Sequence, residues 1–340
     1  MELYDRIHAY LTGKLYPFWY ARVAAAEGGF TTHFDRNGRP SGETDKTIIQ
    51  QTRSIFMLSH AIRNGYDAGK ARGLLKPGME WFLKTFKDTE HEGWLWIVDK
   101  DGKPKSTDKI MYGQSFVIYC MSECALATGN AVARTTAEQT FALVQKYAAD
   151  TRYGGYREMF LRDWQPRPSG AYGGDRKSFD VHMHLMEAYT TLYELTRAEV
   201  HRRKLLEVMD LLWARMFHEP TWTGIAQYAL DLTPLPAIMF KTVWGADRDN
   251  EGAPRPLNNT SYGHNIEFLW LFLHALEVLG MGADPWKEKL SALAQHTVRW
   301  DYLGHAWKNN YHTTRSMVQT LIRLKKIEER GLSPPDGRGW

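Results

Sequence analysis

Residues 92–104 read EGWLWIVDKDGKP, a segment with tryptophans two positions apart, at 94 and 96, before a turn that contains aspartate and glycine. Alternation with a period of two, followed by an Asn-Gly or Asp-Gly turn, is typical of a short β-hairpin. Two similar segments occur, GGFTTHFDRNGRP at 28–40 and GGYREMFLRDWQP at 154–166. The three segments begin about 62 to 64 residues apart, which indicates a repeat architecture.

Helical patterns lie in pairs between the hairpins and continue after the third one. In most pairs one helix is apolar nearly all round, which is typical of a buried helix, and its partner is amphipathic and faces water on one side. This alternation predicts an all-α fold with inner and outer layers of helices, as in a closed α/α toroid, joined by short β-hairpin loops. We find no linker-like stretch and expect one domain over residues 1–340. Besides an N-terminal helix, the patterns predict helices at 46–64, 68–88, 112–128, 132–150, 178–196, 198–217, 262–280, 285–300 and 312–329.

The composition narrows the class of protein. Hydrophobic residues make up 43% of the chain and charged residues 24%, as in ordinary globular proteins. The net charge of +4 comes from scattered side chains, so we expect no nucleic-acid partner and no membrane partner. The N-terminus does not resemble a signal peptide, and a cytoplasmic location follows. Cys120 and Cys124 are spaced as neighbours on one helix face, and we expect buried, inert thiols. The 13% aromatic content suits a cavity that stacks sugars, although core packing also uses such residues.

Two apolar helices share an unusual histidine pattern. In DVHMHLMEAY, residues 180–189, His184 and Glu187 are three apart and lie on one helix face, whereas His182 points away. The same spacing places His264 and Glu267 together in the later helix. Because buried polar groups cost several kcal/mol when they stay unsatisfied, two such pairs indicate one shared polar cavity. For His182 we expect a structural role in the core.

Alternatives remain open for each of these residues. Any lone histidine in an apolar helix can be a core residue with one hydrogen bond. Helical pairs of this kind also bind di-iron, but the order is reversed here and the bridging acids are not evident, so we expect no metal. Arg53, within an apolar helix, suits either a buried ion pair or the recognition of an oxyanion. His312, at a loop-to-helix junction, suits either a cap or a catalytic base.

Four motifs in order resemble the N-acylglucosamine 2-epimerase superfamily, which includes cellobiose 2-epimerases and aldose isomerases. They are KTIIQQTRSIF, DVHMHLMEAYTTLY, SYGHNIEFLWL and WKNNYHTTRSM, beginning at residues 46, 180, 261 and 307. The resemblance implies an (α/α)6 barrel with a sugar in its mouth, and neither a metal nor a redox cofactor. It also implies a small-molecule carbohydrate as the partner, and we expect a monomer or a homodimer.

The resemblance assigns a role to each matching residue. His264 matches a first catalytic base and Glu267 its supporting acid, while His312 matches a second base on the other face of the substrate. His184 matches the histidine that is linked to ring opening. Arg53 matches the arginine that binds oxygens near C1 and C2 of the sugar.

Three further residues complete the expected substrate site. Trp307 matches a sugar-contacting tryptophan of the family. Asp180 stands where cellobiose epimerases have asparagine, which changes the expected sugar contacts. We also expect Tyr112, at the start of the helix predicted over 112–128, to bind substrate.

The chain departs from the family between Trp300 and Asp301. Family members carry there a helix similar to KEWWPQAE, and this chain lacks roughly two helices at that point. The helix patterns agree, because they number about ten rather than twelve. The histidine motifs are all present despite this missing segment, but we expect part of the wall between them to be absent.

The predicted activity is that of an isomerase, an aldose 2-epimerase or aldose–ketose isomerase that works through an enediolate. A glycoside hydrolase on the same barrel is one alternative, and would need two carboxylates across the scissile bond. Candidates for those carboxylates are Asp108, Asp175, Asp180 and Glu187. A catalytically inert sugar-binding protein is the other alternative. The sequence does not name the sugar.

Overall fold

The computed structural model describes residues 2–168, 174–219, 221–235, 238–239, 256–257, 260–300 and 310–329. Most of these residues are helical, and each predicted helix is present with boundaries that differ by a few residues. The helices are α1 (Glu2–Tyr10), the π-helical turn η1 (Leu11–Leu15), α2 (Tyr16–Tyr20), α3 (Ile48–Arg63), α4 (Ala68–Phe86), α5 (Met111–Thr128), α6 (Ala131–Tyr147), α7 (Phe179–Thr196), α8 (Glu199–Arg215), α9 (Tyr262–Leu279), the 3-10 turn η3 (Asp284–Trp286), α10 (Lys287–Trp300) and α11 (Asn310–Glu329).

Short strands connect the helices, and every pairing between them is antiparallel. The strands are β1 (Lys46–Thr47), β2 (Ile97–Val98), β3 (Pro104–Ser106), β4 (Lys109–Ile110), β5 (Met159–Phe160), β6 (Arg176–Ser178), β7 (Phe217–His218), β8 (Thr223–Gly224), β9 (Gln227–Ala229), β10 (Ile238–Met239) and β11 (Pro256–Leu257). In the three-stranded sheet β2 lies between β1 and β3, and the other strands form the pairs β4–β5, β6–β9, β7–β8 and β10–β11.

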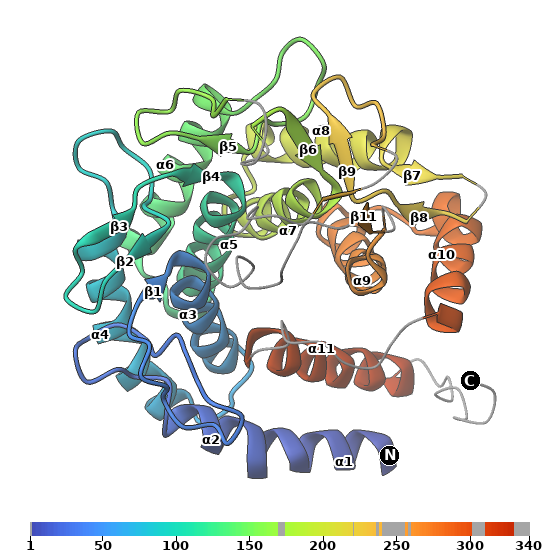
Figure 1. Ribbon diagram of the computed structural model, residues 1–340. Coiled ribbons are helices and arrows are strands. Elements are labelled where there is room, and N and C mark those ends of the chain that lie inside the picture. Colours follow the sequence, from blue (N-terminus) through green and yellow to red (C-terminus); the bar gives the residue numbers. More distant parts are fainter. Residues whose placement is uncertain are drawn as a thin grey trace.

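The helices form the predicted toroid (Figure 1). Helices α3, α5, α7 and α9 follow one another on the inner side of the ring, and α4, α6, α8 and α10 lie outside them. Helix α11 packs on α3, and α1 packs on α11, so the last inner helix returns to the first. If α1, η1 and α2 are counted as one helix and η3 is counted with α10, the described residues form ten helices, as expected.

The inner helices begin with matching local signals. The side chains of Thr47, Ser178 and Ser261 stand just before α3, α7 and α9, and each accepts a backbone N–H from the first turn. Such caps satisfy donors that a helix cannot satisfy itself. Strands β1, β4 and β6 run directly into α3, α5 and α7, so the hairpins gather at the end of the ring where the inner helices begin.

The hairpin repeat is present, and it has a fourth unit that the sequence patterns did not reveal. In each unit, the fourth residue of an inner helix accepts the backbone N–H of a hairpin residue. Gln51 binds Phe30, Gln114 binds Trp94, His182 binds Tyr156 and Asn265 binds Gly224, at N···O or N···N distances of 2.8 to 3.2 Å. His182 therefore occupies the position that Gln51, Gln114 and Asn265 have in the other units. This agrees with the structural role expected for it.

Buried lysines form a second repeating feature. In the first three units, a lysine two residues before the inner helix pairs with an acid of the preceding turn. The pairs are Lys46–Glu27 at 2.8 Å, Lys109–Asp88 at 2.7 Å and Lys177–Asp150 at 2.7 Å. Each lysine is almost fully buried, so its charge requires this partner. These pairs hold the hairpins against the starts of α3, α5 and α7.

Helix α9 differs from its expected environment. Its apolar sequence predicts burial all round, but Leu273 is 38% exposed, and Ile266, Leu269 and Trp270 are only partly buried. This exposure follows from the packing of its neighbours. Helix α9 packs closely on α7 and α10, whereas α11 contacts it through long side chains. The sector between α10 and α11 is where the sequence lacks the expected helix pair.

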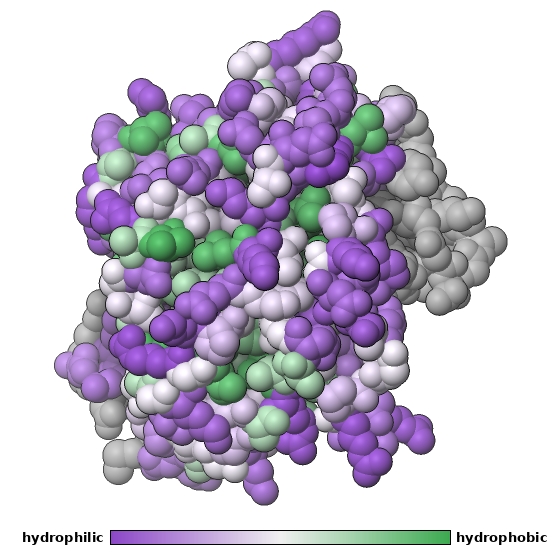
Figure 2. Space-filling model, turned by 90° about the vertical axis from the view of Figure 1, so that its left-hand side faces the viewer, coloured by the Kyte–Doolittle hydropathy of each residue, from purple (hydrophilic) through white to green (hydrophobic). Residues whose placement is uncertain are grey.

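The outer face is mainly hydrophilic, and apolar residues appear on it as separate patches (Figure 2). This agrees with the amphipathic character of α4 and α6, whose buried residues include Leu75, Phe82 and Phe141. None of the helices in the described ranges combines the length and the apolar character needed to cross a membrane.

Candidate active site

The predicted site residues lie in the first two turns of the inner helices. Arg53 comes from α3, Tyr112 from α5, His184 from α7, and His264 with Glu267 from α9. These turns lie at the hairpin end of the ring, so residues more than 200 positions apart in the sequence converge there.

Arg53 lies against aromatic residues of α5. Its Nη2 donates to the Tyr112 hydroxyl at 2.9 Å, and its guanidinium lies 4.7 Å from the centre of the Phe116 ring. The Arg53 residue is only 4% exposed. Burial raises the pKa of the Tyr112 phenol well above its ordinary value, although Arg53 opposes this effect. At neutral pH, Tyr112 is therefore an un-ionised hydroxyl beside a fixed cation.

His184 has one ring nitrogen bound and one without a partner. Its Nδ1 lies 2.8 Å from Glu187 Oε2, and its Nε2 is buried without a hydrogen-bond partner among the residues that the structure describes. The Glu187 carboxylate favours the tautomer in which Nδ1 carries the proton, and this leaves a lone pair on Nε2. Buried polar atoms are nearly always satisfied, which makes this nitrogen a candidate contact point for a ligand.

His264 lies beside His184. The two ring centres are 6.1 Å apart, and the ring planes are nearly perpendicular, at 87°. Burial lowers the pKa of His264 below its ordinary value; His184 and Arg53 add to this effect, while Asp180 and Glu267 oppose it. A histidine with a lowered pKa is neutral at pH 7, which is the form that can accept a proton.

Glu267 and Asp180 both act on His264 through their charges. Asp180 is the second residue of α7, and its Oδ1 accepts the backbone N–H of Val181 at 3.0 Å. Glu267 is bound by the guanidinium of Arg315 from α11. The expected supporting acid of His264 is therefore itself held by a cation.

Arg315 is the main residue that the sequence patterns missed. Its guanidinium binds Glu187 of α7 as well as Glu267 of α9, and it lies 4.6 Å from the centre of the Trp270 ring. Burial disfavours the charged guanidinium, but the two carboxylates outweigh this cost and raise the pKa of Arg315. The available signal was an arginine one helical turn after His312.

Two predicted residues are not placed. Trp307 lies outside the described residues. The backbone of His312 belongs to the first turn of α11, one turn before Arg315, but its side chain lies outside the described part of the structure.

Three side chains of the site also have a spacing that suits a cation. Donor atoms of His184, His264 and Glu267 all lie within 4.8 Å of one another. The electrostatics are less suitable, because Arg315 binds Glu267 and Arg53 adds a second positive charge beside His264. The carboxylate of Glu267 is therefore already neutralised by the protein.

Of the four acids proposed for a hydrolase, Asp180 and Glu187 lie on α7 beside the histidines of the site. Asp108 is paired with Arg167, and Asp175 lies 3.6 Å from Arg176. Glu187 is bound by His184 and Arg315. These pairings do not favour two carboxylates that face one scissile bond.

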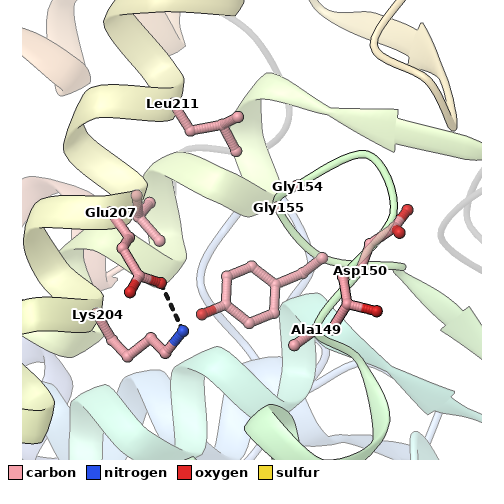
Figure 3. Close-up of a pocket in the computed structure, with 10 residues that line it drawn as sticks. Ala149, Asp150, Gly154, Gly155, Lys204, Glu207 and Leu211 are labelled. Atoms are coloured by element: carbon pink, nitrogen blue, oxygen red, sulfur yellow. Dashed lines mark hydrogen bonds and ion pairs between the residues drawn. The ribbon is translucent and has the colours of Figure 1, made fainter.

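A pocket and a buried charged pair lie elsewhere in the described residues. A pocket of about 220 Å³ lies between α8 and the loop 149–156, where Lys204 and Glu207 form an ion pair (Figure 3). No histidine lines it. His60 and Glu123 are buried near the opposite ends of α3 and α5, with the Nδ1 of His60 2.7 Å from Glu123, and the exposed Arg63 also binds Glu123. Burial opposes ionisation of Glu123, but His60 and Arg63 lower its pKa to about 2.

Cys120 and Cys124 are buried free thiols, as expected.

The sequence profile of the N-acylglucosamine 2-epimerase family matches residues 28–321. This chain belongs to that family. A cellobiose 2-epimerase of Dictyoglomus turgidum is 24% identical over 281 residues, which cover 82% of this chain and 66% of the relative. A cellobiose 2-epimerase of Ruminococcus albus is 29% identical over 280 residues, which cover 81% of this chain and 66% of that protein. The chain thus spans about two thirds of the length of these curated relatives.

The fold agrees with the family. The solved structure of a cellobiose 2-epimerase from Spirochaeta thermophila superposes with a TM-score of 0.76, at 20% identity, and the match covers 96% of this chain and 98% of that one. The predicted α/α barrel is confirmed by this likeness.

Proposed function

We propose that the protein is a sugar epimerase or isomerase that moves a proton at C2 of an open-chain aldose. The observation that carries the proposal is the convergence of two histidines, with ring centres 6.1 Å apart, on a site that also holds the Arg53 guanidinium. Family membership supports the same chemistry. The names of the curated relatives make cellobiose the first sugar to test.

The reaction begins with the cyclic sugar. His184 is the candidate for ring opening, because its Nε2 has no hydrogen-bond partner in the described residues and its Nδ1 is held by Glu187. Nε2 accepts the proton of the C1 hydroxyl as the bond from C1 to the ring oxygen breaks. The ring oxygen takes up a proton from water, and His184 returns its proton to the solvent. The product is an open-chain aldehyde.

Removal of the C2 proton follows. The carbonyl group makes this proton acidic when its oxygen is stabilised, and Arg53 is the candidate for binding the oxygens on C1 and C2. His264, neutral at pH 7, accepts the proton, and Glu267 supports the imidazolium that forms. The first turns of α5, α7 and α9 add positive partial charge near the enediolate. Stabilisation of such an oxyanion by fixed donors is generally the largest electrostatic contribution to catalysis.

Return of the proton decides the product. A second base on the opposite face of C2, for which His312 is the candidate, gives the epimer. Return of the proton to C1 gives the ketose instead. Tyr112, Asp180 and Trp307 are the candidates for holding the sugar hydroxyls during these steps. The sequence of steps is redox-neutral and needs neither a metal nor an organic cofactor.

The proposal is tested by incubating the protein with cellobiose, mannose, glucose and N-acetylmannosamine and separating the products. We expect one C2 epimer or ketose, and we expect His264→Gln to lower kcat by about 100- to 10,000-fold. His182→Gln is the matched control and retains activity, because His182 binds the hairpin. Activity that survives His264→Gln but is lost in Asp180→Asn would favour a hydrolase, and sugar binding without any turnover would favour an inert protein.

A further inference from the structure

One guanidinium joins the three helices that carry the three histidines. Arg315 of α11 binds Glu187, which holds His184 of α7, and it also binds Glu267, which acts on His264 of α9. Its own helix carries His312 one turn earlier. Arg315 is 3% exposed and Glu187 is 2% exposed, so water screens these charges poorly.

The charges around the two histidines show what Arg315 contributes. The acids are Asp180 and Glu187 on α7 and Glu267 on α9, and the cations are Arg53 on α3 and Arg315 on α11. The un-ionised hydroxyls of Tyr112 and Tyr119 come from α5. With Arg315 removed, three carboxylates would face one remaining cation.

That imbalance would act on the histidines themselves. A carboxylate within about 4 to 6 Å favours the protonated form of a neighbouring histidine and raises its pKa by about 1 to 3 units. A protonated imidazole has no lone pair and cannot remove a proton from carbon. The acids that orient the bases would therefore also disable them at neutral pH.

We propose that Arg315 is a positioning residue that neutralises Glu187 and Glu267, so that both acids orient the histidines of the site while the histidines stay unprotonated at neutral pH. The inference rests on the proposed function, since it concerns the same bases. It assigns Arg315 no contact with the sugar. It also explains why α11, which has few close backbone contacts with α9, is held at its first turns by buried charge.

The test compares pH profiles of three variants. In Arg315→Met, the acid limb of kcat/KM moves to higher pH by about 1 unit or more, so activity at each pH well below the limb falls about 10-fold or more and recovers largely by pH 9. KM changes little. Arg315→Lys keeps the charge and keeps the limb near its wild-type position. Arg323→Met is the matched control, because Arg323 is on the same helix and lies 5.9 Å from the Trp270 ring centre, but its hydrogen bonds go to Gln319.

A purely structural role gives a different result. If Arg315→Met lowers activity by the same factor at every pH and leaves the acid limb in place, the inference is overturned. The double variant Glu187→Gln with Arg315→Met adds a check, since removal of the unpaired acid is expected to return the limb toward its wild-type position. A limb that stays shifted in the double variant contradicts the role given to Glu187.

A second measurement does not depend on turnover. Histidines labelled with 13C at Cε1 report their protonation by NMR, and two of the 13 histidine signals are expected to titrate at higher pH in Arg315→Met than in the wild type. If these signals shift but the wild type turns over no sugar, the proposed function is refuted and the inference about charge still holds. Unchanged titration in a folded variant that still turns over sugar would refute the inference alone.

Discussion

His182→Gln is expected to make the protein less sensitive to acid while leaving its activity intact. His182 is fully buried; its Nδ1 lies 2.8 Å from the Ser178 carbonyl, and its Nε2 accepts the Tyr156 N–H at 3.0 Å. A proton on Nε2 would face another donor. Burial therefore lowers the pKa of His182 to about 4, although the hydrogen bond to Ser178 opposes the effect.

The size of the effect follows from linkage between protonation and folding. The folded protein binds fewer protons than the unfolded chain between pH ~6.5 and pH ~4, so stability is fully present above this window and falls as the pH drops through it. The pKa is about 6.5 in the unfolded chain and about 4 in the folded protein. Lowering the pH from neutral therefore removes about 2 kcal/mol of unfolding free energy by pH 5 and about 3 kcal/mol by pH 4.

Glutamine removes the titration without removing the hydrogen bond. Gln51 and Gln114 accept the equivalent hairpin N–H in two other repeats, so the substitution copies a solution that the same fold already uses. Urea unfolding at pH 8 and pH 5 measures the outcome, with His91→Gln, at a partly exposed position, as the control. His182→Gln should lose about 2 kcal/mol less than the control between these values. Equal losses in both variants would refute the assignment.

Three further outcomes test other parts of the account. Arg53→Lys should lower kcat by about 100- to 1,000-fold with little change in the unfolding midpoint, because lysine cannot reproduce the planar donors beside Tyr112; steady-state kinetics measures this. Prolonged treatment with a chelator should leave turnover unchanged and release no stoichiometric metal by mass spectrometry, whereas lost activity that returns with added metal would make His184, His264 and Glu267 a metal site. Glu123→Gln should lower stability by about 3 kcal/mol and leave kcat unchanged, because it breaks a buried pair with His60 far from the site; chemical unfolding shows whether this is so.

Most of the fold could be predicted because its signals are local and repeated. The alternation in residues 92–104 and the apolar runs that become α3, α5 and α7 each required only a short window of sequence. The pairing of His184 with Glu187 was also predictable, since three residues on one helix fix their relation. The boundaries differ mainly where a helix yields to a hairpin, as at Lys87, which pairs with Trp94 instead of continuing α4.

The remainder depended on contacts between distant segments. The fourth hairpin, which is closed by the bridge between Tyr228 and Pro234, was missed because its segment begins with Trp222 and Thr223 instead of a glycine entry and its turn lacks Asn-Gly or Asp-Gly. Arg315 was missed because its partners lie 128 and 48 residues away, and no pattern near it indicates two acids. The partial exposure of α9 could not be predicted from its own sequence, because it reflects which helices stand beside it.

Exchange of the C2 proton with solvent is the most direct measurement of the central claim that two bases flank one carbon atom. Each epimer of the substrate is incubated in D2O with the wild type, with His264→Gln and with His312→Gln, and deuterium at C2 is followed by NMR. The account predicts exchange from both epimers in the wild type, and from opposite single epimers in the two variants, because each variant keeps one base and one face. Exchange from both epimers in either variant, or no deuterium at C2 in the wild type, would contradict it.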